Sequence, residues 1–150
     1  MEKMFLKFNK NDCMGCHACE VACKQQNNLG VGPRLIRVIE GSCDFTPVFC
    51  HQCAKAPCMD ACPVEAISKN EKGIVLIDDN ACIGCRECLD ACPFGAMQFE
   101  EKQETAVKCD LCYSRILEGR TTACISVCPT RCIRLGGKKS IAAVFEKEPI

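Results

Sequence analysis

Short apolar runs, separated by polar turns, follow one another along most of the chain. Each run is brief, alternating or fully apolar, and bounded by Gly, Asn or Asp, which is the pattern of short β-strands. The runs are Phe5–Phe8, Leu35–Ile39, Ile74–Ile77, Ala96–Phe99 and Ile133–Leu135. Segments that follow Cys-Pro, such as Val64–Ile67, predict single helical turns. The pattern therefore predicts an α+β fold of short helices and small antiparallel hairpins, with few regular elements.

None of these runs is long enough to cross a membrane. The longest uncharged stretch after the cysteine-rich region, Ser140–Phe145, is far shorter than the ~20 apolar residues that a spanning helix needs. The N-terminal residues Met1–Phe8 carry scattered charges and no small-residue cleavage site, so they do not resemble a signal peptide. We therefore expect a cytoplasmic protein, in a compartment where thiols stay reduced.

Composition changes this picture, because 18 of the 150 residues are Cys. Such a density is typical of disulfide-linked secreted domains or of metal and cluster proteins, and a reducing compartment favours the second class. The chain has no Trp, one Tyr and only 5% aromatic residues, so its apolar core is expected to be thin. Inorganic clusters are candidates to replace the missing core.

Sixteen of the cysteines fall into four groups of nearly equal spacing. Group one is Cys13, Cys16, Cys19 and Cys23; group two is Cys50, Cys53, Cys58 and Cys62; group three is Cys82, Cys85, Cys88 and Cys92; group four is Cys109, Cys112, Cys124 and Cys128. Groups one and three have the C-x2-C-x2-C-x3-C spacing of bacterial ferredoxins, in which three cysteines hold one [4Fe–4S] cluster and the fourth reaches the other. Groups two and four carry insertions only between their second and third cysteines. The spacing predicts iron–sulfur clusters.

The cluster loops make specific demands on the backbone. Gly15 and Gly84 precede the second cysteine of their groups and suit a positive φ and a close approach of backbone to the cluster. Backbone N–H groups in such loops are expected to donate to the sulfurs, which helps to set the reduction potential. We expect the fourth cysteine to lie at the start of a helix or on a short turn, pointing away from the first three and fixed by the Pro that often follows it.

Loop, short helix and small hairpin together form the repeating unit of a two-cluster ferredoxin, used twice. We expect groups two and three to form an inner module, residues 43–99. Groups one and four would form an outer module, residues 1–42 together with 100–150.

The formal net charge of the chain is zero when every Cys is counted as a neutral thiol. Cluster ligands are thiolates, however, and four bound clusters would bring the oxidised protein to about −8. A basic nucleic-acid surface is therefore not expected. Neither a Gly-rich phosphate loop nor a dinucleotide fingerprint is present in the sequence, which argues against a nucleotide-binding enzyme.

From Asp12 to Leu135 the chain resembles the four-cluster iron–sulfur subunits of dimethyl sulfoxide reductase type, a family that includes subunits of formate dehydrogenases, hydrogenases and tungsten aldehyde oxidoreductases. In that family the first group ends in Cys-Lys-x-x-Asn where the others end in Cys-Pro, and Cys23–Asn27 has this form. Group four, with Cys-Asp-Leu-Cys-Tyr at its start and Cys-Pro-Thr at its end, is also similar to the family's.

The resemblance implies four [4Fe–4S] clusters whose ligands cross between groups. One cluster would be held by Cys13, Cys16, Cys19 and Cys128, and a second by Cys109, Cys112, Cys124 and Cys23. A third would be held by Cys50, Cys53, Cys58 and Cys92, and a fourth by Cys82, Cys85, Cys88 and Cys62. Because every set is complete, no iron is left open for a substrate.

The same resemblance implies a non-catalytic subunit that relays single electrons. Its expected partners are an external electron donor or acceptor protein and a catalytic subunit, either a molybdenum or tungsten pterin enzyme, such as an aldehyde oxidoreductase or formate dehydrogenase, or a hydrogenase. The chain lacks the C-terminal extension that contacts the membrane in some relatives, which favours a soluble complex. A free polyferredoxin that serves several enzymes is the alternative.

A zinc-binding interaction module is the weaker alternative, since zinc sites usually combine two C-x2-C pairs, often with His. Only His17 and His51 are present, and we expect both to donate hydrogen bonds or face solvent. Cys43 and Cys132 remain outside the four groups. They could be a redox pair or extra ligands, but we favour small buried apolar side chains for both.

Overall fold

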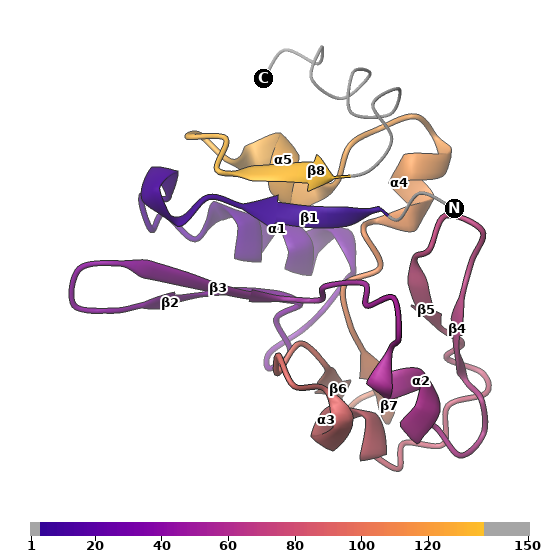
Figure 1. The fold of residues 1–150 in the computed structure, drawn as a ribbon. Helices are drawn as coiled ribbons and strands as arrows, with labels where there is room; N and C mark the ends of the chain where they lie inside the picture. The colour runs from indigo at the N-terminus through magenta and orange to yellow at the C-terminus, as the bar shows by residue number, and fades with distance from the viewer. Residues whose placement is uncertain (1–3, 137–150) are drawn as a thin grey trace.

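The computed structural model describes residues 4–136. Residues 1–3 and 137–150, which belong to the predicted outer module and include the uncharged stretch Ser140–Phe145, lie outside the described residues. Figure 1 shows short helices and two-stranded hairpins joined by long loops. The predicted α+β class with small antiparallel hairpins is confirmed.

Within residues 4–136 the strands form four antiparallel pairs. They are β1 (Phe5–Phe8) with β8 (Ile133–Gly136), β2 (Ile36–Glu40) with β3 (Phe45–Phe49), β4 (Ile67–Lys69) with β5 (Val75–Ile77), and β6 (Gln98–Glu100) with β7 (Thr105–Val107). Each of the five predicted runs contains or overlaps a strand. The pattern missed β3 because Pro47 interrupts it, but both strands of a two-stranded sheet are edges, where Pro is tolerated.

Four helices carry the third cysteine of a group at their second position. They are α1 (Ala18–Gln26), α2 (Pro57–Ala61), α3 (Glu87–Ala91) and α5 (Ala123–Val127). A further helix, α4 (Tyr113–Leu117), lies in the insertion of group four, and a 3-10 turn, η1, spans Lys10–Asp12. Since the fourth cysteine follows four residues after the third, each C-x3-C pair spans about one helical turn.

Of the two positions expected for the fourth cysteine, the start of a helix is wrong and the short turn is confirmed in three groups, because the cysteine ends a helix and begins a turn. Cys62, Cys92 and Cys128 are the C-caps of α2, α3 and α5, with ψ between 113° and 115°. Each precedes Pro, which disfavours the α region for the residue before it and so stops the helix. Group one has Lys24 in place of Pro, and α1 therefore continues past Cys23 to Gln26.

The helical turn predicted after Cys-Pro is also wrong. Val64 lies in a turn, Glu65 has a left-handed φ of 52°, and β4 begins at Ile67. A non-Gly residue with positive φ does not continue a right-handed helix. The polypeptide instead reverses after the cysteine and enters a hairpin.

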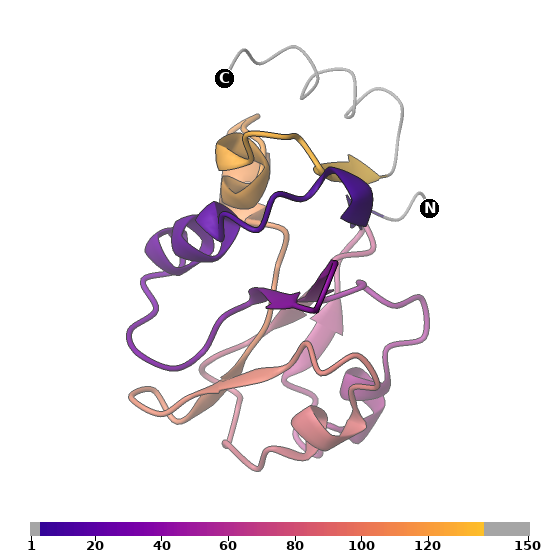
Figure 2. The same ribbon diagram turned by 90° about the vertical axis from the view of Figure 1, so that its left-hand side faces the viewer.

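The first and last elements of the described residues meet at one level of the molecule, and the elements between them form another (Figures 1 and 2). At the first level β1 pairs with β8 and α1 packs on α5, while at the second α2 packs on α3. The predicted module boundary at 42/43 falls in the turn between β2 and β3, and that at 99/100 falls inside β6. The division into an outer and an inner module stays a prediction.

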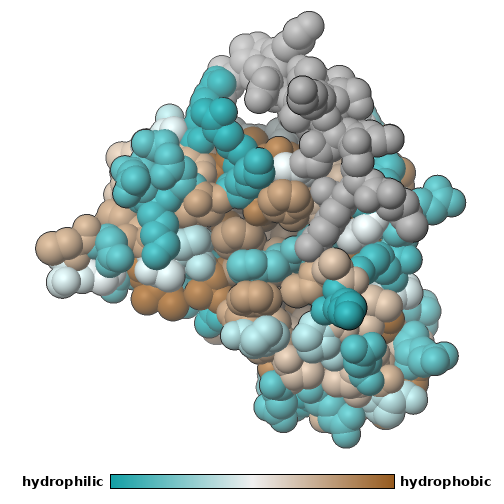
Figure 3. All heavy atoms as spheres, in the orientation of Figure 1, coloured by the Kyte–Doolittle hydropathy of each residue, from teal (hydrophilic) through white to brown (hydrophobic). Residues whose placement is uncertain are grey.

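Cysteines contribute directly to the buried core. One cluster of buried residues combines apolar side chains such as Leu6, Ile36 and Ile133 with cysteines of groups one and four. A second, smaller cluster combines Ile67 and Val75 with cysteines of groups two and three. On the face in Figure 3, apolar residues gather mainly across the middle and hydrophilic ones toward the margins. Residues 4–136 contain no helix that is long and apolar enough to cross a membrane.

Candidate functional site

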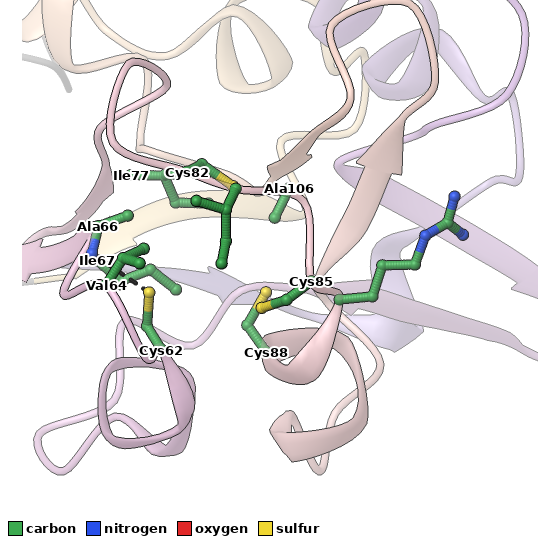
Figure 4. Close-up of a pocket in the computed structure, with 11 residues that line it drawn as sticks. Cys62, Val64, Ala66, Ile67, Ile77, Cys82, Cys85, Cys88 and Ala106 are labelled. Carbon is green, nitrogen blue, oxygen red and sulfur yellow. Dashed lines mark hydrogen bonds between the residues drawn. The ribbon is translucent and has the colours of Figure 1, made fainter.

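Three cavities are each lined by four grouped cysteines, three from one group and one from another. We call them site II (Cys23, Cys109, Cys112 and Cys124), site III (Cys50, Cys53, Cys58 and Cys92) and site IV (Cys62, Cys82, Cys85 and Cys88). Their volumes, open solvent included, are about 320, 360 and 330 Å³. In site IV the sulfurs of Cys62, Cys85 and Cys88 point toward a common space, with Cys82 on its other side (Figure 4).

The remaining four grouped cysteines, which we call site I, are Cys13, Cys16, Cys19 and Cys128. The Cys19 thiol is close enough to Cys16 and Cys128 for both to raise its pKa, although burial is the larger cause and brings it to about 11. Cys13 and Cys128 in turn both act on the neighbouring thiol of Cys132. The structure thus places cysteines from both ends of the chain side by side.

The C-x3-C helices lie between cavities and serve two sites at once. In α2 the third cysteine of the group, Cys58, lines site III, and the fourth, Cys62, lines site IV. In α3 the arrangement is reversed, with Cys88 at site IV and Cys92 at site III. Packing of α2 against α3 therefore brings each helix to the cavity of the other's group.

All four C-x2-C loops turn through a left-handed residue just before their second cysteine. Gly15 and Gly84 have φ of 70° and 72°, which confirms the expectation for these glycines. Gln52 and Leu111 occupy the same position in the other two loops, with φ of 48° and 57°. Both are completely buried, so surrounding contacts hold a conformation that costs a non-Gly residue on the order of 1–2 kcal/mol. Alignment of the four groups would have found them.

Gln52 ties the loop of site III to that of site II. Its side-chain amide donates to the Cys109 carbonyl (2.8 Å), and its Oε1 accepts from the N–H of Val75 (2.8 Å). The Lys108 ammonium, also buried, donates to the same Cys109 carbonyl (2.8 Å) and lines site III. Sequence reasoning missed both residues, because neither belongs to a ligand motif.

Backbone N–H groups donate to sulfurs at sites II, III and IV, as the loop geometry requires. Gln52 donates to Cys50 Sγ (3.4 Å), Leu111 to Cys109 Sγ (3.4 Å) and Ala66 to Cys62 Sγ (3.2 Å). The first two bonds run from the left-handed residue to the first cysteine of its own loop. Such bonds stabilise negative charge on sulfur and help to fix its reduction potential.

Burial makes these thiols poor acids in the absence of metal. It raises the pKa of Cys23 and Cys124 to about 12 and also raises that of Cys109. Metal binding needs thiolates, so it must displace a proton from each of these groups. A set of four thiols in a largely apolar cavity fits an iron–sulfur cluster, which cysteine thiolates hold.

Smaller contributions to the pKa values reveal which sites are neighbours. After burial, the pKa of Cys124 at site II is raised in part by Cys19 at site I. The pKa of Cys109 at site II is raised in part by Cys50 at site III. The pKa of Cys88 at site IV is raised in part by Cys58 at site III.

Glu20 fixes the helix that follows the site I loop. This buried carboxylate accepts from the N–H of Val38 (2.6 Å) and from Arg34 Nη1 (3.2 Å), which joins α1 to β2. His17 lies 3.2 Å from the same carboxylate and donates through Nε2 to Glu40 (2.9 Å). The expectation of a hydrogen-bonded His17 is confirmed, and its pKa is raised chiefly by the bond to Glu40.

The remaining His and Cys residues differ in their surroundings. His51 is stacked between the rings of Phe49 and Phe94, with centroids 5.3 and 3.8 Å away. Cys132 is buried, as predicted, and its Sγ lies 3.5 Å from Cys128 Sγ. Cys43 is exposed, so the prediction of a buried side chain is wrong there. This cysteine lies in the turn between β2 and β3.

Among residues 4–136, no three His, Cys, Asp or Glu side chains are grouped to hold one metal ion. A single zinc ion needs its ligands about 2.0–2.3 Å from one point. In sites II to IV four cysteines line each cavity, which is the ligand number of a [4Fe–4S] cluster.

Replacement of Gly84 by Ala is expected to destabilise the site IV loop. A Cβ there would lie 2.5 Å from the Glu104 carbonyl oxygen, on a backbone with φ of 72°. The control is Gly119→Ala, where φ is 75° but a Cβ meets nothing within 4 Å. Thermal unfolding should show that the control lowers the free energy of unfolding by about 1–2 kcal/mol, because of the left-handed backbone alone. Gly84→Ala should lower it by more. Equal costs would mean that the close approach to Glu104 is unimportant.

Comparison with known proteins adds independent information. A family model described as a 4Fe-4S dicluster domain matches residues 41–138, and one described as a 4Fe-4S binding domain matches residues 10–26. The first match begins near the hairpin turn of β2 and β3 and ends beyond β8. Together the two matches include all sixteen grouped cysteines.

Several relatives are similar over most of the chain. The putative electron transport protein YsaA of Escherichia coli (strain K12) is 41% identical over 141 residues, 87% of this chain and 87% of YsaA. The B subunit of the anaerobic dimethyl sulfoxide reductase of Haemophilus influenzae is 34% identical over 150 residues, 89% of this chain and 73% of the relative. Thiosulfate reductase electron transfer subunit PhsB of Salmonella typhi is 39% identical over 135 residues, 83% of this chain and 70% of PhsB.

The names of these relatives refer to electron transport or to components of reductases, in agreement with the expectation of a non-catalytic subunit. The resemblance based on the cysteine groups is confirmed by the family match, which spans more than half of the chain. The chain therefore belongs to the 4Fe-4S dicluster domain family of iron–sulfur proteins, which includes electron-transfer subunits of dimethyl sulfoxide and thiosulfate reductases.

Proposed function

We propose that this chain holds four [4Fe–4S] clusters, one at each of sites I to IV, and relays single electrons between a redox partner and the catalytic subunit of an oxidoreductase complex. The ligands would be the sixteen cysteines of the four sites. Bound clusters supply one-electron chemistry over a wide range of potentials. The observation that carries the proposal is that three cavities are each lined by four thiols, drawn from two different cysteine groups.

The protein's own residues have three tasks in this function. The cysteines provide the ligands, and apolar side chains such as Ile67, Met97 and Leu6 line the cavities and limit the access of water. Backbone N–H groups donate to the sulfurs at three of the sites. Burial and hydrogen bonding are the properties by which a protein tunes the potential of a cluster.

The electrostatic influence of cysteines at one site on the pKa of cysteines at another supports a single row in the order I, II, III, IV. Each pair of interacting cysteines from different sites joins consecutive members of this row. At its two ends Cys16 of site I and Cys85 of site IV are exposed. Electrons would enter at one end and leave at the other, where a partner protein can approach.

The proposed catalytic partner is a molybdenum or tungsten pterin enzyme or a hydrogenase. Two relatives are named as components of a dimethyl sulfoxide reductase and of a thiosulfate reductase, which supports a partner of the reductase type. YsaA, named only as an electron transport protein, favours the second candidate, a free carrier that serves several enzymes. Size-exclusion chromatography of a gentle anaerobic extract separates them: a subunit elutes with a large partner, whereas a free carrier elutes alone.

Purification without oxygen is expected to yield about sixteen iron and sixteen sulfide ions per chain, because four complete ligand sets are present. Metal and sulfide analysis, with protein measured by amino-acid analysis, gives this number directly. Eight or fewer of each after full reconstitution would contradict four clusters. Zinc in their place would favour an interaction module instead.

A further inference from the structure

The residue four positions after the fourth cysteine of each group distinguishes sites I and II from sites III and IV. After Cys62 and Cys92 this residue is Ala66 and Ala96, both buried and without a polar side chain. After Cys23 it is Asn27, and after Cys128 it is Cys132. The internal repeat thus holds a donor side chain at two sites and a methyl group at the other two.

Both donor side chains reach the sulfur of the fourth cysteine. Asn27 Nδ2 donates to Cys23 Sγ (3.5 Å) and to the Cys23 carbonyl (2.8 Å), and Asn27 lines the site II cavity. Cys132 Sγ lies 3.5 Å from Cys128 Sγ and is buried. Its backbone is held in place by its carbonyl, which accepts from the N–H of Asn9 (2.8 Å).

Ligation decides the direction of the bond between the two thiols. A cysteine bound to iron is a thiolate, which has no proton and can only accept. If Cys128 is a ligand of site I, Cys132 must therefore keep its proton and donate. Two hydroxyl groups would also donate to ligand sulfurs. Thr122 Oγ1 lies 3.2 Å from Cys124 Sγ at site II, and Thr130 Oγ1 lies 3.8 Å from Cys128 Sγ.

We propose that Asn27 and Cys132 are a matched pair of positioning residues, which raise the reduction potentials of the clusters at sites II and I through hydrogen bonds to ligand sulfurs. The inference rests on the proposed function, because it needs clusters at these sites. A reduced cluster carries one more negative charge than an oxidised one, so a donor to its sulfur stabilises the reduced form more. Ala66 and Ala96 provide no side-chain donor at sites IV and III, and Ala66 donates to Cys62 Sγ only through its backbone N–H.

The test is a set of variants titrated by electron paramagnetic resonance during anaerobic reduction. Cys132→Ala should make one cluster about tenfold harder to reduce, a fall of 59 mV for a one-electron couple. Cys132→Ser keeps a donor and should restore most of the wild-type potential. Asn27→Leu should lower the potential of a different cluster, and the double variant should lower both.

Two controls assign the shifts. Cys43→Ala alters an exposed cysteine in a hairpin turn and should leave every potential unchanged. In a Cys13→Ala background, which removes a proposed ligand of site I, Cys132→Ala should no longer shift any remaining cluster. A shift that persists there would overturn the assignment of Cys132 to site I.

Unchanged potentials in both Cys132→Ala and Asn27→Leu, with about sixteen iron still bound, would overturn this inference and leave the proposed function standing. Equal shifts in Cys132→Ala and Cys132→Ser would also overturn it, because packing and not hydrogen bonding would then be the cause. Wild-type protein with too little iron for four clusters would instead refute the proposed function.

Discussion

Removal of the clusters with a chelator and an oxidant is expected to unfold most of residues 4–136. Four of the five α-helices described there have only five residues, and every sheet has two strands. Helices and hairpins of this size are not stable alone in water. What holds them together is packing around the cysteines, which form part of both buried clusters.

Typical free energies of metal binding and of folding support a large loss of stability when the clusters are removed. A structural zinc site contributes about 10–16 kcal/mol of binding free energy to folding, whereas a whole domain is typically stable by only about 5–15 kcal/mol. If a cluster contributes on the same scale, the loss of one removes most of the stability and the loss of all four removes it entirely.

Far-ultraviolet circular dichroism and amide hydrogen exchange measure this result. The apo-protein should lose most of its ellipticity, its protected amides and its cooperative thermal transition. Anaerobic reconstitution with iron and sulfide is the control, and it should recover all three. An apo-protein with a cooperative, native-like thermal transition would contradict the idea that clusters replace the core.

Double variants are expected to show that ligands cross between groups. Cys23→Ala and Cys109→Ala should each lose about four of sixteen iron ions, as a [4Fe–4S] cluster needs its full ligand set. Because both residues line site II, the double variant should also lose only about four. Cys23→Ala with Cys13→Ala should lose about eight, since these residues belong to different proposed sites.

Local ligation makes the opposite prediction. If each group held its own cluster, Cys23 and Cys13 would share one, and the losses of the two double variants would be exchanged. Cys43→Ala is the matched control and should keep all of the iron. Tests at Cys128 need a Cys132→Ala background, because the second thiol lies 3.5 Å away and can substitute as a ligand.

The strands were predictable where side chains alone specify them. Phe5–Phe8 and Ile133–Leu135 have compact apolar sequences, and both form strands at or near those bounds. β3, β4 and β7 were missed, since Pro47 interrupts the first and the other two have only three residues each. Each is paired with a strand that was predicted, β2, β5 or β6. Short strands of this kind depend on tertiary contacts, which a local pattern does not contain.

The candidate sites were likewise predictable from the sequence only in part. Spacing alone identified the sixteen cysteines, and the lack of a Cβ identified Gly15 and Gly84 as left-handed. The equivalent role of Gln52 and Leu111 was not visible, because buried contacts and not residue type hold their backbones at positive φ. The helix start expected at the fourth cysteine is wrong for a local reason: the Pro that follows it ends a helix, and the polypeptide then enters the short turn that was the other expectation.

The N-terminal part of the chain can fold only late in synthesis, because β1 pairs with β8 and α1 packs on α5. The hairpins in the middle of the chain are complete once Val107 has been made. By contrast, α1 cannot pack on its partner until α5, Ala123–Val127, has been made. At 5–20 residues per second, roughly 5–20 s pass between the synthesis of these helices. During that interval the first four thiols are exposed to oxygen and to competing metals. Nascent chains that stall before α5 should therefore be the form most easily oxidised in the cell.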